Sequence, residues 1–246
     1  MTQFCDLADL YDQLTDNVPY DKYFAQIERL FRRYRQRPRI VLELACGTGS
    51  LTRLLALQGY EMIACDLSPD MLGKARDKCE GLDVQPVFIC QDMCALDLYG
   101  TVQAAVCCLD SVNYLTDRRR LRQAFSRVSL FMEPGGLFLF DVKTPEMFRS
   151  MDGLCSAAEG EGFFTAWQYG FDRRSGLCVH QIDLFFQQGG VYRRSTEEHI
   201  QRAWPREVLE QTLEQCDFRL RGVFDGLTSR AANEEKGRLF FAAQKK

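Results

Sequence analysis

The chain has 246 residues, of which 46% are hydrophobic and 26% are charged, and its formal net charge is −3. This length suits one large α/β core with an elaboration, because two complete domains would leave little room for two separate hydrophobic cores. The small negative charge provides no overall attraction to nucleic-acid phosphates or anionic lipids, so partners of these classes are disfavoured.

Three further features of the composition bear on location and metal content. No apolar run approaches the ~20 residues that a membrane helix needs, and no signal region is recognisable, so we expect a cytoplasmic protein. The 11 cysteines are odd in number and scattered through apolar segments, which indicates reduced thiols. The only histidines are His180 and His199, and no cysteine pair has zinc-finger spacing, so we expect no metal site. The oligomeric state is not indicated.

Residues 1–36 are expected to form a helical arm that precedes the core. Apolar residues recur at helical spacing between Phe4 and Tyr34, with a turn marked by Asn17 and Pro19. Two amphipathic helices are the predicted result.

Short apolar runs then alternate with segments of helical periodicity. The expected strands are Ile40–Leu44, Glu61–Cys65, Val84–Cys90, Val102–Leu109 and Leu137–Val142, and the expected helices are Ser50–Gln58, Pro69–Cys79 and Asp117–Met132. Alternation of this kind predicts a parallel sheet covered by helices on both faces.

The first of these strands leads into a turn that contains two glycines. Gly47 and Gly49 stand just before a helix, where a backbone without Cβ can adopt positive φ and approach a ligand closely. A dinucleotide fingerprint needs a third glycine three positions later, but Thr52 stands there. The second strand closes on Asp66, a carboxylate that can accept hydrogen bonds from both ribose hydroxyls. Ser68 is the expected N-cap of the next helix.

The pattern changes after Asp141. Aromatic-rich extended runs at Gly162–Phe171, Leu177–Gln187 and Val191–Ala203 are separated by turn sequences at 173–176 and 188–190. They predict a three-stranded antiparallel insert within residues 143–203, which we expect to cover the ligand site at the glycine turn as a lid. A helix from Pro205 to Cys216 and two last strands, Phe218–Phe224 and Arg238–Ala243, complete the chain.

Five short motifs together resemble those of the class I S-adenosylmethionine-dependent methyltransferases. They are Leu42-Glu43-Leu44-Ala45-Cys46-Gly47-Thr48-Gly49, Cys65-Asp66-Leu67-Ser68-Pro69, Gln91-Asp92-Met93, Leu109-Asp110-Ser111-Val112-Asn113-Tyr114-Leu115 and Glu133-Pro134-Gly135-Gly136-Leu137-Phe138. Ala45 replaces the first glycine of the most common loop, which is a frequent variant in that family. The resemblance covers the core, residues 1–142 and 204–246, and implies a Rossmann-like seven-stranded sheet ending in an antiparallel hairpin.

The resemblance also implies that S-adenosylmethionine is the cofactor. Glu43 would organise the loop, Asp66 would bind the ribose hydroxyls, and Asp92 would accept a hydrogen bond from the adenine amine. The expected cofactor-binding residues are Tyr11, Tyr20, Glu43, Ala45, Gly47, Gly49, Asp66, Leu67, Met71, Gln91, Asp92, Met93, Leu109, Asp110 and Ser111. Tyr11 and Tyr20 resemble arm tyrosines that close over the cofactor in some members, although core packing explains them equally well.

Tyr114 and His199 are the candidate catalytic residues. Tyr114 follows the fourth strand at the carboxyl edge of the sheet, where open α/β folds bind ligands. His199 shares one face of a strand with Glu197 and Gln201, and on a lid such a face could take a proton from the substrate. The alternative for His199 and Glu197 is a ladder of polar groups on an exposed sheet face.

We therefore expect methyl transfer to a small-molecule acceptor by in-line displacement, in which alignment matters more than a reactive side chain. The sequence leaves three alternatives open. A methyltransferase acting on tRNA or on a protein or peptide is supported by arginine clusters at 32–37 and 118–120. A non-catalytic S-adenosylmethionine-binding protein would keep the same loop. A nicotinamide-dependent oxidoreductase is opposed by Thr52 and by the antiparallel terminal strands.

Overall fold

Apolar strands form a seven-stranded sheet, sheet A, at the centre of the structure, a computed structural model that describes residues 10–246. Its strands are β1 (Ile40–Leu44), β2 (Glu61–Asp66), β3 (Val87–Cys90), β4 (Val102–Cys107), β5 (Met132–Lys143), β10 (Phe218–Asp225) and β11 (Arg238–Lys245), in the order β10-β11-β5-β4-β1-β2-β3. β1 to β5 pair in parallel, and β11 pairs antiparallel with both β5 and β10. The expected fold class and terminal hairpin are confirmed.

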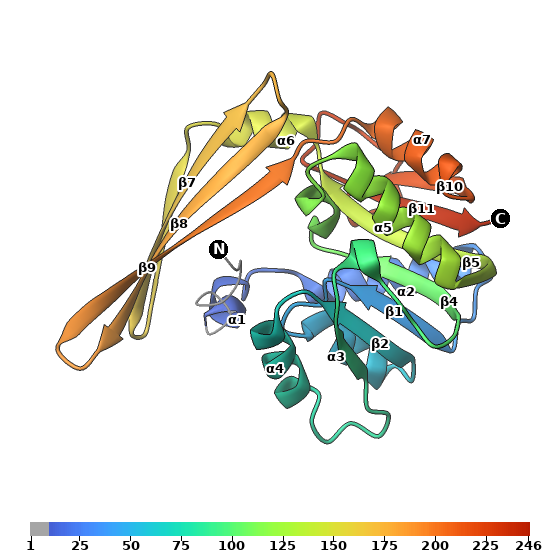
Figure 1. Ribbon diagram of the computed structural model, residues 1–246, viewed down its shortest axis with the longest axis horizontal. Coiled ribbons are helices and arrows are strands. Elements are labelled where there is room, and N and C mark those ends of the chain that lie inside the picture. Colours follow the sequence, from blue (N-terminus) through green and yellow to red (C-terminus); the bar gives the residue numbers. More distant parts are fainter. Residues whose placement is uncertain (1–9) are drawn as a thin grey trace.

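Helices cover both faces of sheet A (Figure 1). They are α2 (Tyr20–Arg33), α3 (Ser50–Leu57) and α4 (Pro69–Lys78) on one face, and α5 (Arg118–Phe131) and α7 (Arg206–Gln215) on the other. The strands are buried on both faces, so successive residues such as Val41 and Leu42 on β1 enter opposite layers of the core. Ser68 accepts a hydrogen bond from Met71 N and caps α4, as predicted.

A second sheet, sheet B, follows α6 (Pro145–Met151) and projects from the core (Figure 1). It contains β6 (Cys155–Gly160), β7 (Phe163–Asp172), β8 (Leu177–Gln188) and β9 (Val191–Arg202) in antiparallel order β6-β7-β8-β9. The prediction of three strands was wrong by one. β6 is an edge strand of mostly small and exposed residues, so it lacks the aromatic and alternating pattern that identified its neighbours.

Two further boundaries differ from those expected. The strand predicted from Val84 begins only at Val87, because Pro86 has no N–H to donate to a neighbouring strand. In the arm, α1 is a short helix, Tyr11–Leu14, and the part of the arm expected to begin at Phe4 lies outside the described residues.

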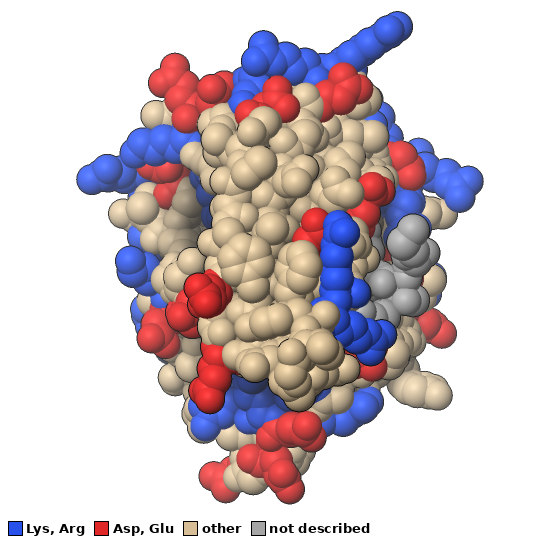
Figure 2. All heavy atoms as spheres, turned by 90° about the vertical axis from the view of Figure 1, so that its left-hand side faces the viewer, with Lys and Arg blue, Asp and Glu red and all other residues tan. Residues whose placement is uncertain are grey.

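Sheet B and the core enclose α1 between them (Figure 1). Leu10, Tyr11 and Leu14 pack against Phe163 and Ile182 on the inner face of sheet B. Figure 2 shows the side of the molecule that lies at the left of Figure 1, where sheet B is, and this side carries mostly uncharged side chains across its middle and charged ones around its rim. Among residues 10–246, no helix combines the length and the apolarity that a membrane span requires.

Candidate active site

In the glycine turn after β1, every second residue from Ala45 to Gly49 adopts the left-handed backbone conformation. Ala45, Gly47 and Gly49 have φ of 53°, 55° and 75°. This path aims the Gly47 N–H at Asp66, whose Oδ2 accepts it at 2.8 Å. The first two parallel strands are thereby joined at their carboxyl ends, where sheets of this type bind ligands.

The two glycines of the turn serve different contacts. A Cβ on Gly49 would lie 2.9 Å from Ala75 Cβ, so this glycine lets α4 pack tightly against the turn. A Cβ on Gly47 would lie 3.8 Å from Tyr11 Cε1, so the turn faces the arm tyrosine at this point. Gly47, more than Gly49, is positioned to line a ligand.

Asp66 retains acceptor capacity beyond its structural bonds. Its Oδ1 accepts from Ser68 N at 2.9 Å and its Oδ2 accepts from Gly47 N, which leaves about two of its four lone-pair sites. Burial raises the pKa of Asp66, while the backbone N–H groups of Ser68 and Gly47 oppose that shift. Next to it, the side chain of Leu67 is 67% exposed, which is unusual for a large apolar residue at a sheet edge.

Glu43 lies beneath the turn and is buried. Its Oε2 accepts a hydrogen bond from Thr52 Oγ1 at 2.5 Å. Burial raises the pKa of Glu43 to about 8, so the carboxyl group is mainly protonated at neutral pH. Thr52 stands where a dinucleotide fingerprint has its third glycine, and its hydroxyl is the hydrogen-bond donor to Glu43.

The residues predicted to meet adenine divide into two groups. Gln91 bonds to the backbone of Asp97 through both its amide nitrogen and its amide oxygen, so its side chain holds the loop. Asp92 accepts from Cys94 N at 2.9 Å and from Arg120 Nη2 at 2.9 Å. Met71 is buried and Met93 is partly buried against the core. Asp92, Met93 and the exposed Leu67 remain candidates to contact an adenine ring.

The arm is fastened over the glycine turn by polar contacts. Asp12 on α1 accepts from Thr48 Oγ1 at 2.6 Å and from Lys78 Nζ at 2.7 Å, and Lys78 also donates to Ser50 Oγ at 2.7 Å. Burial, with Tyr20, Asp110 and Asp66 as further contributors, raises the pKa of Tyr11 far above its usual value. Tyr11 therefore lies among the groups of the predicted cofactor site, with Tyr20 close by.

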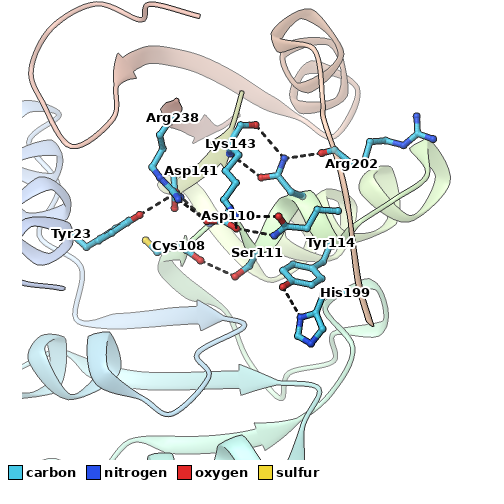
Figure 3. Close-up of polar contacts among 12 residues, drawn as sticks. Tyr23, Cys108, Asp110, Ser111, Tyr114, Asp141, Lys143, His199, Arg202 and Arg238 are labelled. Carbon is cyan, nitrogen blue, oxygen red and sulfur yellow. Dashed lines mark hydrogen bonds and ion pairs between the residues drawn. The ribbon is translucent and has the colours of Figure 1, made fainter. Parts of the chain in front are cut away.

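A network of ion pairs occupies the carboxyl ends of β4 and β5 (Figure 3). Asp110 contacts Arg238 Nη2 at 2.7 Å, Lys143 Nζ at 3.0 Å and Gln201 Nε2 at 2.8 Å. Burial alone would raise the pKa of Asp110, but the Lys143 and Arg238 cations lower it well below its usual range. Asp141 also pairs with Arg238. Sequence reasoning missed Asp141 as a site residue, although it lies near the carboxyl end of a buried strand.

Backbone strain accompanies this network. Leu109 and Asp110 are consecutive non-glycine residues in the left-handed region, with φ of 60° and 52°. Such strain persists only where surrounding contacts enforce it, and it concentrates at functional sites. The strained pair turns the chain so that Asp110 faces Arg238 and Lys143.

Neighbouring residues of the same loop have structural partners. Asn113 donates to the carbonyls of Lys143 and Arg202 and accepts from Lys143 N at 3.0 Å, so its amide joins sheet B to the core. It is fully buried. Ser111 Oγ donates to Cys108 O at 2.8 Å. The side chain of Asn113 therefore holds the two sheets together.

Tyr114, His199 and Glu197 form a continuous chain of contacts. Tyr114 OH lies 3.0 Å from His199 Nδ1 (Figure 3), and His199 Nε2 lies 2.8 Å from Glu197 Oε2. His199 is 2% exposed and Glu197 is 7% exposed. The alternative of a ladder on an exposed face is therefore wrong, because the polar face of β9 turns inward against the loop that carries Tyr114.

His180 lies on the neighbouring strand, β8, and continues the polar face that His199 and Glu197 form on β9. It pairs in register with His199 across β8 and β9. Burial, and then the Lys143 cation, lower the pKa of His180 to about 4, so its imidazole is neutral at physiological pH. Its Nε2 is buried and has no hydrogen-bond partner among residues 10–246.

Other candidate reactive groups are the two cysteines at the end of β4 and the side chains that could bind a metal ion. Cys107 and Cys108 are buried, and burial raises the pKa of each thiol well above its usual value, so neither is a thiolate nucleophile. Within residues 10–246, no group of three or more potential metal ligands is gathered.

Comparison with known proteins identifies the family. The chain is 35% identical over 246 residues to "Putative methyltransferase YqeM" of Bacillus subtilis (strain 168), an alignment that spans 97% of this chain and 95% of that protein. It belongs to the class I S-adenosylmethionine-dependent methyltransferases. A family model described as a methyltransferase domain matches residues 41–136 of this methyltransferase.

Solved structures agree with this assignment. A S-adenosylmethionine-dependent methyltransferase from Clostridium acetobutylicum superposes with a TM-score of 0.87 at 27% identity and covers 98% of both chains. The sugar N-methyltransferase KedS8 from Streptoalloteichus superposes with a TM-score of 0.80 at 20% identity, which shows the shared fold. The methyltransferase thus uses S-adenosylmethionine within the Rossmann-like sheet described above.

The residues at the edge of sheet A suit this cofactor. Asp66 has free acceptor capacity for hydroxyl donors, Leu67 offers exposed apolar surface for a ring, and Gly47 has no Cβ on the side that faces Tyr11. The carboxylate of Asp110 stays ionised nearby, and Lys143 and Arg238 balance its charge. The residues of the turn therefore fit the ribose hydroxyls and the ring of a nucleoside.

Proposed function

We propose that this methyltransferase acts on a small-molecule acceptor held between the inner face of sheet B and the carboxyl edge of sheet A. One observation carries the proposal. In the polar chain Tyr114–His199–Glu197, His199 and Glu197 are buried and Tyr114 is partly buried between these two layers, where a folded macromolecule has no access. Residues 1–142 and 204–246 would then form the cofactor-binding core, and residues 143–203 the lid over the acceptor.

Cofactor binding is assigned to the residues along the sheet edge. Asp66 would hold the ribose hydroxyls, Leu67 and Met93 would pack on adenine, and Asp92 would accept from its amine. Gly47 and Ala45 would admit the ligand close to the backbone, and Tyr11 would cover it. When bound, S-adenosylmethionine supplies an electrophilic methyl group.

Proton removal from the acceptor is assigned to the buried polar chain. The hydroxyl of Tyr114 would take the acceptor's proton while passing its own to His199 Nδ1, and Glu197 would stabilise the imidazolium that forms. Burial raises the pKa of Tyr114 well above its usual value, so the hydroxyl is neutral before the reaction and can act only as a relay. His180, neutral and opposite His199, would orient the acceptor.

Relatives support a small acceptor. A protein of Streptomyces fradiae named dTDP-3-amino-3,6-dideoxy-alpha-D-glucopyranose N,N-dimethyltransferase is 28% identical over 238 residues, 90% of this chain and 91% of that protein. The acceptor in the name of that protein is a sugar nucleotide, which is a small molecule. A compact polar acceptor of comparable size would match the enclosed position of His199 and Tyr114.

The test is release of S-adenosylhomocysteine from S-adenosylmethionine during incubation with fractionated metabolites, with bulk tRNA and unfolded protein in parallel. Small-metabolite turnover should fall about 10²–10⁴-fold in Tyr114→Phe and in His199→Ala, the range for lost proton transfer. Calorimetric affinity for S-adenosylhomocysteine should stay the same in both variants. Gln181→Ala is the matched control, because Gln181 is exposed on the opposite face of β8.

Two results would contradict the proposal. Turnover only with tRNA or protein would show that the acceptor is a macromolecule. Unchanged turnover in both variants would show that Tyr114 and His199 do not relay a proton, and it would leave the cofactor assignment intact.

A further inference from the structure

A cavity lies at the edge of sheet A opposite the cofactor turn. It has a volume of about 620 Å³ and is walled by the end of α2, the segment that leads into β1, and the turn between α3 and β2. Three arginines, Arg32, Arg35 and Arg37, line it, together with Glu28 and Tyr60. β1 begins beside this cavity and ends at the glycine turn, so the two sites lie at opposite ends of one strand.

The charges in this cavity are unbalanced. Glu28 is already engaged by Arg32, at 3.4 Å, and by the Tyr60 hydroxyl. Within residues 10–246, neither Arg35 nor Arg37 forms an ion pair or donates a side-chain hydrogen bond to another residue. Two guanidinium groups, charged at every physiological pH, are thus available at the cavity in a chain whose net charge is −3.

The position of Arg35 adds an independent observation. α2 ends in a Schellman arrangement, with Gln36 N bonded to Phe31 O at 2.8 Å and Arg35 N bonded to Arg32 O at 3.1 Å. The residue at this point of the motif is left-handed and is usually glycine, because a Cβ is strained there. Arg35 occupies it with φ of 55°. The chain therefore tolerates backbone strain at the place where a guanidinium is presented to the cavity.

We propose that this cavity binds the diphosphate group of a small molecule. Planar guanidinium forks match phosphate oxygens in a bidentate way, and two unpaired forks match two linked phosphates better than one. The cavity has room beyond the diphosphate for an organic group, with the half-exposed ring of Tyr60 in its wall. This site is separate from the proposed methyl-transfer site and does not depend on it.

The experiment is calorimetric titration with inorganic pyrophosphate at low ionic strength. Pyrophosphate is the probe because a nucleotide could also occupy the adenine position at the other edge. Wild-type protein should bind it, and Arg37→Ala should raise the dissociation constant at least tenfold, which is the scale of a lost charged hydrogen bond.

The Arg35→Gly variant distinguishes a loss of pyrophosphate binding from a loss of stability. Glycine adopts the left-handed conformation without strain, so the melting temperature should equal or exceed that of wild type. The dissociation constant for pyrophosphate should nevertheless rise at least tenfold. Arg173→Ala, in the exposed turn between β7 and β8, is the control for diffuse charge and should leave binding unchanged.

Three outcomes would overturn the proposal. They are no measurable heat with wild type, unchanged affinity in Arg35→Gly and Arg37→Ala, and an equal loss of affinity in Arg173→Ala. The second would place pyrophosphate elsewhere on the surface, and the third would mean that it responds only to overall charge.

Discussion

Individual acidic residues at the sheet edge have opposite protonation states because their surroundings differ. Asp110 is buried but faces two cations, so its carboxylate stays ionised. Glu43 is equally buried and, among the residues that the structure describes, has only the Thr52 hydroxyl as a hydrogen-bond partner, so it holds a proton near neutral pH. The sequence placed both residues at strand ends, but only their neighbours set the protonation state of each carboxyl group.

Glu43 should make stability depend on pH. Its pKa is about 8 in the folded chain, against 4.5 for an ordinary glutamate, so between these values the folded state keeps a proton that the unfolded state has lost. The contribution is complete below pH 4.5 and disappears as the pH rises towards 8. The free energy of unfolding should therefore fall by up to about 1.4 kcal/mol per pH unit over this range.

Glu43→Gln provides the comparison, since the amide is isosteric and cannot titrate. Urea unfolding at pH 5, 6.5 and 8 should show a shallower decline in the variant than in wild type. Parallel declines in both proteins would mean that Glu43 is ionised throughout.

Among the structural elements, α1 depends most on contacts from outside itself. It has four residues, too few for a stable isolated helix, and no side chain caps its first turn. Its position comes from apolar contacts with sheet B and from the Asp12 contacts to Thr48 and Lys78. The periodicity of the arm predicted helix but gave no partner for α1.

Lys78→Met should loosen α1 over the cofactor turn while keeping the packed methylene chain. The Lys78–Asp12 pair is partly exposed, with side-chain exposures of 23% and 50%, so its contribution is about 0.2–1 kcal/mol. The dissociation constant for S-adenosylhomocysteine should rise about two- to fivefold, measured by calorimetry. Arg76→Met, exposed on the same helix, should leave it unchanged. Equal affinities in the two variants would show that the arm does not cover the cofactor.

For the molecule as a whole, the relation between sheet B and the core is what assembles the second half of the site. Gln201 and His199 on β9 reach Asp110 and Tyr114 of the core across some 90 residues of sequence. Asn113 supports this arrangement, because its buried amide bonds to backbone groups of both β5 and β9.

Asn113→Ala should therefore destabilise the protein and displace sheet B. It removes three hydrogen bonds and leaves buried backbone groups unpaired, which costs about 2–4 kcal/mol. Guanidinium unfolding would measure the loss, and methyl-transfer turnover should fall more than affinity for S-adenosylhomocysteine. Asn233→Ala removes one exposed hydrogen bond, from Glu235 N, so it should lower stability far less and leave turnover unchanged. A variant with wild-type stability would mean that sheet B is held by other contacts.

The sequence by itself determined the central sheet, the glycine turn and the positions of Glu43 and Asp66, because local periodicity and turn chemistry depend on residues close together in the chain. It also singled out His199 and Glu197, although it left open whether they were buried. Tertiary structure alone decided that the polar face of β9 turns inward, that Asn113 holds the sheets together and that Asp141 pairs with Arg238. The strand β6 was missed because an exposed edge strand needs no apolar alternation. Contacts between distant segments depend on how sheet B docks, and no local pattern encodes that docking.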